Sequence, residues 1–119
     1  RAHPYSLSAA PDGQTLRITV KDLGDGSGAL ADVEPGTRVL IEGPYGRLHP
    51  GVRTRRKVTL MASGIGISPM RSLLEGLPQT PGDVTLLYRA RSEDDLALGA
   101  ELERIGRERG ARVVYILGR

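Results

Sequence analysis

The sequence predicts a chain in two parts, an antiparallel β part followed by an α/β part with a parallel sheet. Up to about Arg53, short segments of alternating apolar and polar residues are separated by glycine and proline turns, which is typical of part of a barrel or a sandwich. From about Lys57, the continuous apolar runs "VTLMA", "VTLLY" and "VVYIL" alternate with helical stretches. Such runs indicate parallel strands buried on both faces, as in half of a doubly wound domain.

In the first part we expect strands at "YSLS", "TLRITV" and "RVLIE", with turns at "APDGQ" and "EPGT" between them. In the second part we expect one helix over about 68–77, ended by Pro78. A second helix is expected to begin near Ser92, where Asp95 three residues later completes a capping box, and to end at Gly110.

Composition limits the function classes. The 119 residues are 39% hydrophobic and 26% charged, which is ordinary for one globular domain. Cysteine is absent and the two histidines are far apart in the sequence, so disulfides, thiolate metal sites and a histidine zinc cluster are not expected. The net charge of +3 permits a nucleic-acid partner, but the chain has no Phe or Trp and four Tyr, so stacking surfaces are scarce and we expect no nucleic-acid binding.

The segment "GIGISP" directly follows the first predicted parallel strand. Glycines at such a turn let the backbone approach a diphosphate, and the following helix offers free N–H groups. We therefore interpret Gly64 and Gly66 as a phosphate turn, with Ser68 as N-cap and Pro69 as the first helical residue. The alternative is a tight strand-to-helix turn without a ligand, because the pattern lacks the third glycine of the common dinucleotide motif.

Two arginines, Arg89 and Arg91, follow the next predicted strand. This position normally meets the ribose of the dinucleotide, where an acidic residue favours NAD and an arginine favours the 2′-phosphate of NADP. The pattern favours NADP. The alternative is a pair of exposed arginines in an arginine-rich chain.

Four segments, "HPYSLS", "ITVKDLGDGSGAL", "GPYG" and "GIGISPMRSLLE", occur in this order and together resemble the ferredoxin–NADP-reductase superfamily. The resemblance is strongest to the FAD- and NADPH-binding region of ferric-reductase-like and NADPH-oxidase-like transmembrane proteins. It implies an incomplete FAD-binding barrel over residues 1–53, followed by an incomplete NADP-binding α/β domain over 54–119.

The resemblance also implies roles for residues of the first part. Tyr5 would pack on the flavin ring, Ser6 would hydrogen-bond near the reactive flavin nitrogen as the catalytic residue, and His3 would contact the FAD diphosphate. Taken singly, Tyr5 could equally be a core aromatic residue. The full set of FAD-binding residues implied is His3, Pro4, Tyr5, Ser6, Ser8, Lys21, Gly24, Ser27 and Gly28.

By the same resemblance, the expected activity is hydride transfer from NADPH to FAD, followed by electron transfer to haem and then to ferric iron or oxygen. Haem is expected only in a full-length membrane protein, whose location would be the cytoplasmic face of the plasma membrane; a protein without the anchor would be cytoplasmic. The isolated segment is expected to be inactive and to bind FAD poorly. The alternatives are a soluble FAD/NAD(P)H reductase that feeds an iron–sulfur partner and a regulatory module that binds nucleotide without turnover.

Overall fold

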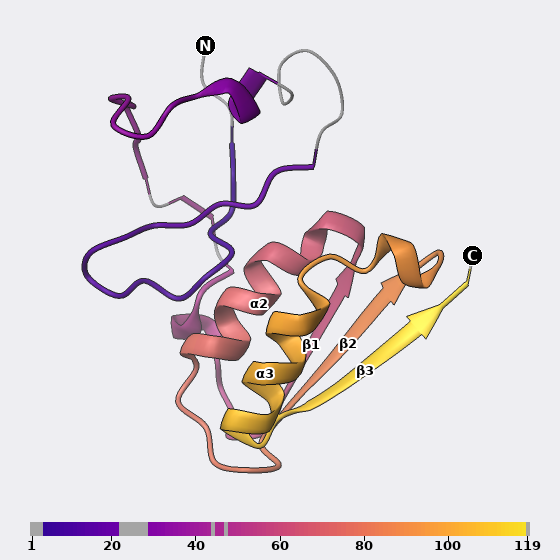
Figure 1. Ribbon diagram of the computed structural model, residues 1–119. Coiled ribbons are helices and arrows are strands. Elements are labelled where there is room, and N and C mark those ends of the chain that lie inside the picture. The colour runs from indigo at the N-terminus through magenta and orange to yellow at the C-terminus, as the bar shows by residue number, and fades with distance from the viewer. Residues whose placement is uncertain (1–3, 22–28, 44, 47, 119) are drawn as a thin grey trace.

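A computed structural model describes residues 4–21, 29–43, 45–46 and 48–118. Four of the predicted cofactor-binding residues lie outside these ranges, namely His3, Gly24, Ser27 and Gly28. The described residues form an irregular N-terminal part, up to the 3₁₀ turn η2 (Pro50–Val52), and a sheet with helices that begins at Val58 (Figure 1).

The sheet confirms the predicted parallel strands. It consists of β1 (Val58–Ser63), β2 (Val84–Ala90) and β3 (Arg112–Leu117), in the order β1-β2-β3 and parallel throughout. Because the strands run in one direction, their carboxyl ends meet at a single edge, where ligands bind in open α/β sheets.

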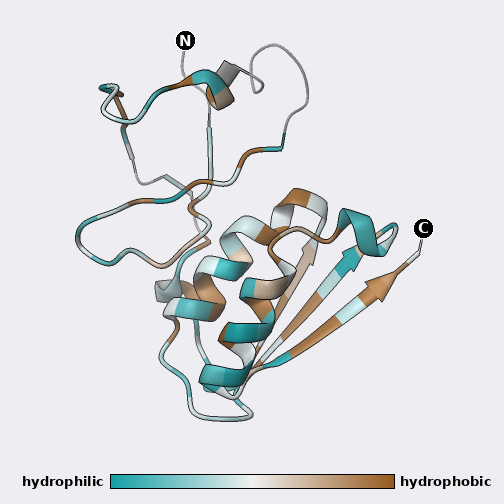
Figure 2. Ribbon diagram, in the orientation of Figure 1, coloured by the Kyte–Doolittle hydropathy of each residue, from teal (hydrophilic) through white to brown (hydrophobic). Residues whose placement is uncertain are grey.

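Two helices, α2 (Ile67–Gly76) and α3 (Gly99–Arg109), connect the strands and lie on the same face of the sheet (Figure 1). Apolar side chains on that face form the core. Figure 2 shows hydrophobic residues, in brown, along the strands and the helices of this part. It contains fully buried residues of β2 and of both helices, namely Ile67, Leu74, Val84, Leu86, Tyr88 and Leu102.

The other face of the sheet is not covered by the described residues, so the expectation of strands buried on both faces is wrong. Met61 is 70% exposed and Ile116 is 46% exposed on that face. The strand order explains this arrangement. The two β-α-β connections move across the sheet in the same direction, from β1 to β2 and from β2 to β3. Because such connections share one handedness, both helices lie on the same side of the sheet.

The predicted start of each helix is also wrong. A 3₁₀ turn, η3 (Gly64–Gly66), leads directly into α2, so that Gly66 is the N-cap and Ser68 and Pro69 lie two positions deeper in the first turn than expected. Both are still within the turn whose N–H groups lack helical acceptors, so Pro69 is tolerated there.

The Ser92–Asp95 pair begins a 3₁₀ turn, η4 (Glu93–Asp95), and not α3. The Ser92 hydroxyl donates to the Asp95 side chain at 3.2 Å. Between this turn and α3, the Ala97 N–H donates to the buried Tyr88 hydroxyl at 3.0 Å. Because of this contact with the sheet, α3 begins only at Gly99. The helix ends at Gly110, which has a left-handed φ of 68°, and this confirms the predicted stop.

The predicted strands of the N-terminal part are not formed. The described residues of that part contain one isolated antiparallel bridge, between Leu7 and Ile18, and a 3₁₀ turn, η1 (Ala29–Asp32), before η2. In the predicted strand "RVLIE", Leu40 is 100% exposed and Val39 is 74% exposed. An extended segment needs a neighbour for its N–H and C=O groups, and among the described residues the isolated bridge, with the Ser8 N–H donating to the Arg17 carbonyl oxygen, does not extend into a ladder.

In the described part of the chain, no helix combines the length and apolar character needed to cross a bilayer.

A buried arginine on α2 joins the two helices. The Arg71 side chain is 3% exposed, and its guanidinium is paired with Glu101 of α3 at 2.8 Å and with Glu75 of α2 at 3.0 Å. Arginine buried in this way requires paired carboxylates because an unpaired buried charge is costly.

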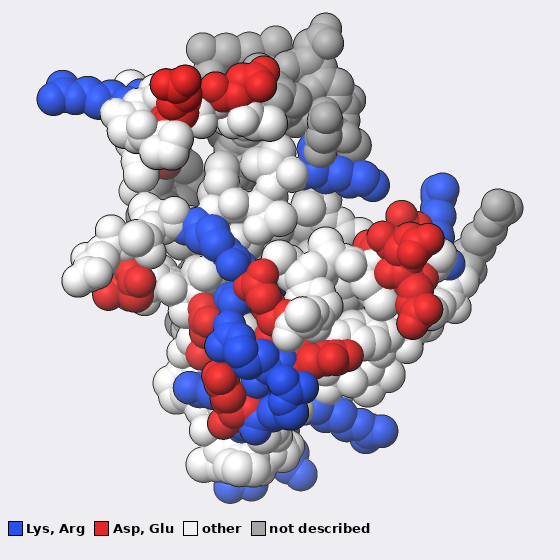
Figure 3. All heavy atoms as spheres, in the orientation of Figure 1, with Lys and Arg blue, Asp and Glu red and all other residues white. Residues whose placement is uncertain are grey.

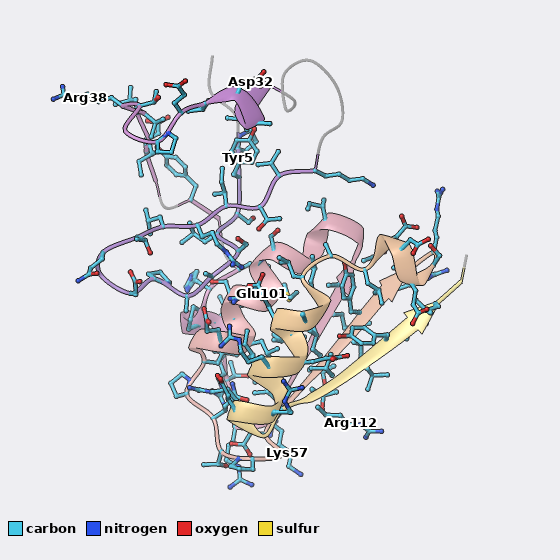
Figure 4. All side chains as sticks on the ribbon, in the orientation of Figure 1. Tyr5, Asp32, Arg38, Lys57, Glu101 and Arg112 are labelled. Atoms are coloured by element: carbon cyan, nitrogen blue, oxygen red, sulfur yellow. The ribbon has the colours of Figure 1, made fainter. Side chains whose placement is uncertain are left out.

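The same two carboxylates also hold the N-terminal part. The Arg17 guanidinium donates to Glu101 at 2.7 Å, and the Ala10 N–H donates to Glu75 at 2.8 Å. Nearby, the Ser72 hydroxyl donates to the Ala9 carbonyl oxygen at 3.1 Å. Figure 4 shows Glu101 on the side of α3 that faces the N-terminal part, and Figure 3 shows basic and acidic side chains gathered together over the helices.

These contacts lower the pKa of both carboxyls. Burial raises the pKa of Glu101, but the hydrogen bond from Arg17 and the charge of Arg71 outweigh it, so the pKa lies below its ordinary value of 4.5. Burial likewise raises the pKa of Glu75, and the N–H of Ala10 with the guanidinium of Arg71 brings it below 4.5.

We expect the Gly110→Ala variant to lose more stability than Gly82→Ala. Both glycines have positive φ, 68° and 88°, so alanine at either site is strained by about 1–2 kcal/mol. A Cβ at Gly110 would also lie 2.8 Å from the Pro81 Cα, whereas a Cβ at Gly82 meets nothing within 4 Å. Denaturant unfolding of both variants measures the difference, and equal losses would contradict the clash.

We expect the free energy of unfolding to fall as the pH falls from about 5 to about 3. Carboxyls with a lowered folded pKa stabilise the protein above their unfolded pKa of 4.5, and this contribution is lost as pH falls through the folded values. Denaturant unfolding as a function of pH measures the slope. The variant with both Glu75→Gln and Glu101→Gln should show a shallower slope, and an unchanged slope would contradict the role of these two residues.

Candidate functional site

The glycine turn at the carboxyl end of β1 is open to solvent. Gly64 adopts a left-handed φ of 59°, and Gly66 has a φ of −58° as the N-cap of α2. Both are exposed, and a Cβ built at either would meet nothing within 4 Å. The sharp reversal at Gly64 turns the chain from strand to helix, and the N-terminus of α2 then presents its N–H groups and positive dipole end beside this free space.

Ser68 supplies a second feature of the turn. The residue is 4% exposed, and its hydroxyl oxygen has no hydrogen-bond partner among the described residues. A buried hydroxyl without a partner is unfavourable unless a ligand or water completes it. The open backbone of the turn, at the start of α2, therefore fits an anionic ligand such as a diphosphate. The Ser68 hydroxyl oxygen, in the first turn of α2, is itself buried.

Arg89 lies close to the start of this turn. It pairs in register with Ser63, the residue that precedes Gly64, and its alternation places it on the uncovered face of the sheet. There it lines a shallow hollow of about 500 Å³ formed by Met61, Ala62, Ser63, Leu87, Arg89, Ile116, Leu117 and Gly118. Arg91 follows the end of β2, is exposed and does not line the hollow. A second hollow, formed by α3 and β3, contains none of the predicted site residues.

The described flavin-side residues divide into exposed and buried ones. Pro4, Tyr5, Ser6 and Lys21 are exposed, with 44% of the surface of Tyr5 accessible. Ser8, in contrast, is fully buried. Its hydroxyl accepts from Thr19 at 2.8 Å and from the Arg17 Nε at 3.0 Å. Ser8 therefore holds the N-terminal segment together in this structure, whereas the ring of Tyr5 (labelled in Figure 4) is accessible to a planar ligand.

The network around Arg71 was missed from the sequence. Arg71 and Glu75 are spaced i, i+4 on α2, a spacing that could have indicated the pair. Arg17 and Glu101 come from distant segments, and nothing local in the sequence connects them. In the described part of the chain no group of three potential metal ligands occurs.

Comparison with known proteins agrees with the fold. Residues 60–118 match the family described as oxidoreductase NAD-binding domain. Ferredoxin–NADP reductase B of Sorangium cellulosum is 32% identical over 108 residues, which cover 87% of this chain and 44% of that protein. NADH-cytochrome b5 reductase 1 of Eremothecium gossypii is 31% identical over 104 residues, covering 84% of this chain and 36% of the relative. The chain thus spans less than half the length of these curated relatives.

Solved structures show the same fold at lower identity. The flavohem-like FAD/NAD-binding domain of nitric oxide dioxygenase from Vibrio cholerae superposes with a TM-score of 0.68 at 24% identity, covering 93% of this chain and 50% of that one. A mutant ferredoxin-NADP⁺ reductase from Plasmodium falciparum, solved in complex with 2′P-AMP, has a TM-score of 0.64 at 18% identity and covers 95% and 53%.

The structure has a parallel sheet with a glycine turn at the end of its first strand. The family match over that sheet and the similarity to known reductases both agree with this fold. The chain belongs to the ferredoxin–NADP-reductase superfamily, and residues 60–118 lie in its NAD-binding α/β domain.

Proposed function

We propose that this chain is part of a flavin-dependent oxidoreductase that passes hydride from NADPH to FAD. The observation that supports this most strongly is the open turn at Gly64–Gly66 with the buried, unpartnered hydroxyl of Ser68 in the helix that follows. The names of the curated relatives, ferredoxin–NADP reductase and NADH-cytochrome b5 reductase among them, support the same reaction class.

In this proposal the nucleotide diphosphate lies against the start of α2. The N–H groups of the turn donate to its oxygens, and the Ser68 hydroxyl gains the partner it lacks. Pro69 fixes the first turn of the helix without removing a needed donor. Arg89 and Arg91, at the end of the neighbouring strand, bind the 2′-phosphate through their guanidinium groups and so select NADP.

On the flavin side, the proposal assigns the exposed ring of Tyr5 to the flavin ring system and the exposed hydroxyl of Ser6 to the polar edge of that ring. Residues 1–53 would then be the FAD-binding part and 54–119 the NADP-binding part. The two cofactors supply the hydride transfer and the subsequent release of single electrons, while the protein aligns them and excludes water.

Two electron acceptors are consistent with this reaction. One is haem, with onward transfer to ferric iron or oxygen, in a protein attached to the cytoplasmic face of a membrane. The other is an iron–sulfur partner of a soluble reductase. A relative named as the ferredoxin–NAD(+) reductase component of an alkene monooxygenase system, 34% identical over 111 residues, lends support to the second. Reduction of added ferredoxin, as against reduction of a haem in the same polypeptide, distinguishes the two.

We expect the Gly66→Val variant to fold normally and to bind NADP(H) at least about ten-fold more weakly. The φ of −58° accepts any residue, and a Cβ there meets no protein atom. The new side chain would instead fill the space in which the diphosphate approaches. Titration of the complete protein with NADPH measures the affinity, and thermal unfolding checks the fold. Normal NADPH affinity in a folded variant would contradict the phosphate site.

We expect the double variant Arg89→Ala with Arg91→Ala to lower the ratio of kcat/KM for NADPH to that for NADH by about ten- to a hundred-fold. Only NADPH carries the 2′-phosphate, so activity with NADH should change little. The control is Arg104→Ala with Arg107→Ala, two exposed arginines on α3. A ratio unchanged from that of the control would refute the assignment of NADP.

A further inference from the structure

The helix that carries the proposed phosphate turn also holds the proposed flavin segment. Helix α2 begins beside Gly66, and about 9 Å further along its axis Ser72 donates to the Ala9 carbonyl oxygen. Ala9 is only a few residues after Tyr5 and Ser6. A single rigid helix therefore lies between the two places at which the cofactors are proposed to bind.

Four further hydrogen bonds hold the flavin segment at this point. The Ala10 N–H donates to Glu75 at 2.8 Å, and the Arg17 guanidinium donates to Glu101 at 2.7 Å. Arg17 also holds Ser8 from two sides, donating to its hydroxyl at 3.0 Å and to its carbonyl oxygen at 2.8 Å. These are charge-assisted hydrogen bonds, which are stronger and more directional than neutral ones.

Close packing of the segment against α2 adds to these hydrogen bonds. A Cβ built on Gly76, at the end of α2, would lie 3.1 Å from the Cβ of Ala10, so the segment packs directly on a helix position without a side chain. Arg71, 3% exposed and bonded to both Glu75 and Glu101, fixes the two carboxylates that receive the segment.

We propose that Arg71, Glu75, Glu101 and Arg17 form an interdomain clamp that fixes the flavin-side segment, residues 5–10, relative to the Gly64–Gly66 turn and so sets the alignment of nicotinamide and flavin. The four are positioning residues, because each acts through the backbone of the segment or through another side chain. The clamp itself rests on the contacts above, and its effect on catalysis rests on the proposed function.

The first test follows docking without any cofactor. In the complete protein, Glu101→Gln removes the charge that Arg17 and Arg71 share while keeping the size of the side chain. We expect amide hydrogen exchange at Ser8 and Ala10 to accelerate about ten-fold, while exchange in the core of β2 stays unchanged. The matched control is Glu108→Gln, which removes an exposed ion pair with Arg104 on the same helix and should leave both regions unchanged. Unchanged exchange at Ser8 and Ala10 in Glu101→Gln would overturn the clamp.

A second variant opens the clamp without altering a charge. Gly76→Ala adds one methyl group against Ala10 and improves the helix propensity of the site, so the variant should fold. We expect it to accelerate exchange at Ala10 and to leave the sheet unaffected. If Glu101→Gln unfolds the protein, this variant decides: exchange at Ala10 equal to that of the wild type would then overturn the clamp.

The kinetic test separates positioning from binding. In the flavin-loaded protein we expect Glu101→Gln and Gly76→Ala to lower kcat for NADPH oxidation about ten-fold and to leave KM for NADPH unchanged, because a misplacement of about 1 Å slows transfer without weakening the grip on the nucleotide. An unchanged kcat in a variant with a loosened segment would overturn the positioning role. If the wild-type protein oxidises no reduced nicotinamide nucleotide, the proposed function fails, and the clamp is judged by hydrogen exchange alone.

Discussion

The packing of helix α2 against the parallel sheet is the interaction on which the other features of this structure depend. Ile67 and Leu74 of the helix are fully buried against strand residues such as Leu86. This burial fixes the helix axis, and the axis determines where its N-terminus points. The glycine turn is thereby held at the carboxyl edge of β1 with Gly64 and Gly66 exposed, although the Ser63 side chain makes no capping hydrogen bond to it.

Helix α2 also contacts the N-terminal part of the chain, on the side that faces away from the sheet. Arg71 belongs to the buried residues, and its pairing with Glu75 and Glu101 turns the surface between the two helices into a fixed set of acceptors. The N-terminal part has no strands of its own among the described residues, yet it is bonded to the helices at three points. The Ala10 N–H donates to Glu75, the Ala9 carbonyl oxygen accepts from the Ser72 hydroxyl, and Arg17, which holds Ser8, donates to Glu101. Order in this part therefore comes from the helices and not from a β ladder.

One face of the sheet and the segment around Leu40 share a different property, since both expose apolar side chains. The sheet face lies beside Arg89 and the hollow at the strand ends, so its exposure affects the region where the nucleotide is proposed to bind. The chain covers less than half of the two curated relatives, and the turn and the two arginines of the proposed nucleotide site all lie within the part that it does cover.

The amino-acid sequence alone determined the three parallel strands, the glycine turn and the end of α3 at Gly110, because apolar runs and glycine positions are local signals of strand, turn and helix end. It did not determine where α3 begins, since the bond between Ala97 and the Tyr88 hydroxyl joins two elements. Only the tertiary structure decided that "TLRITV" and "RVLIE", which alternate as strands do, form no strands in the described residues, where "TLRITV" makes a single isolated bridge. The ion pair between Arg17 and Glu101 was likewise decided by the tertiary structure alone. Strand pairing and ion pairs between distant segments depend on how the elements pack in space, and local sequence patterns do not encode that packing.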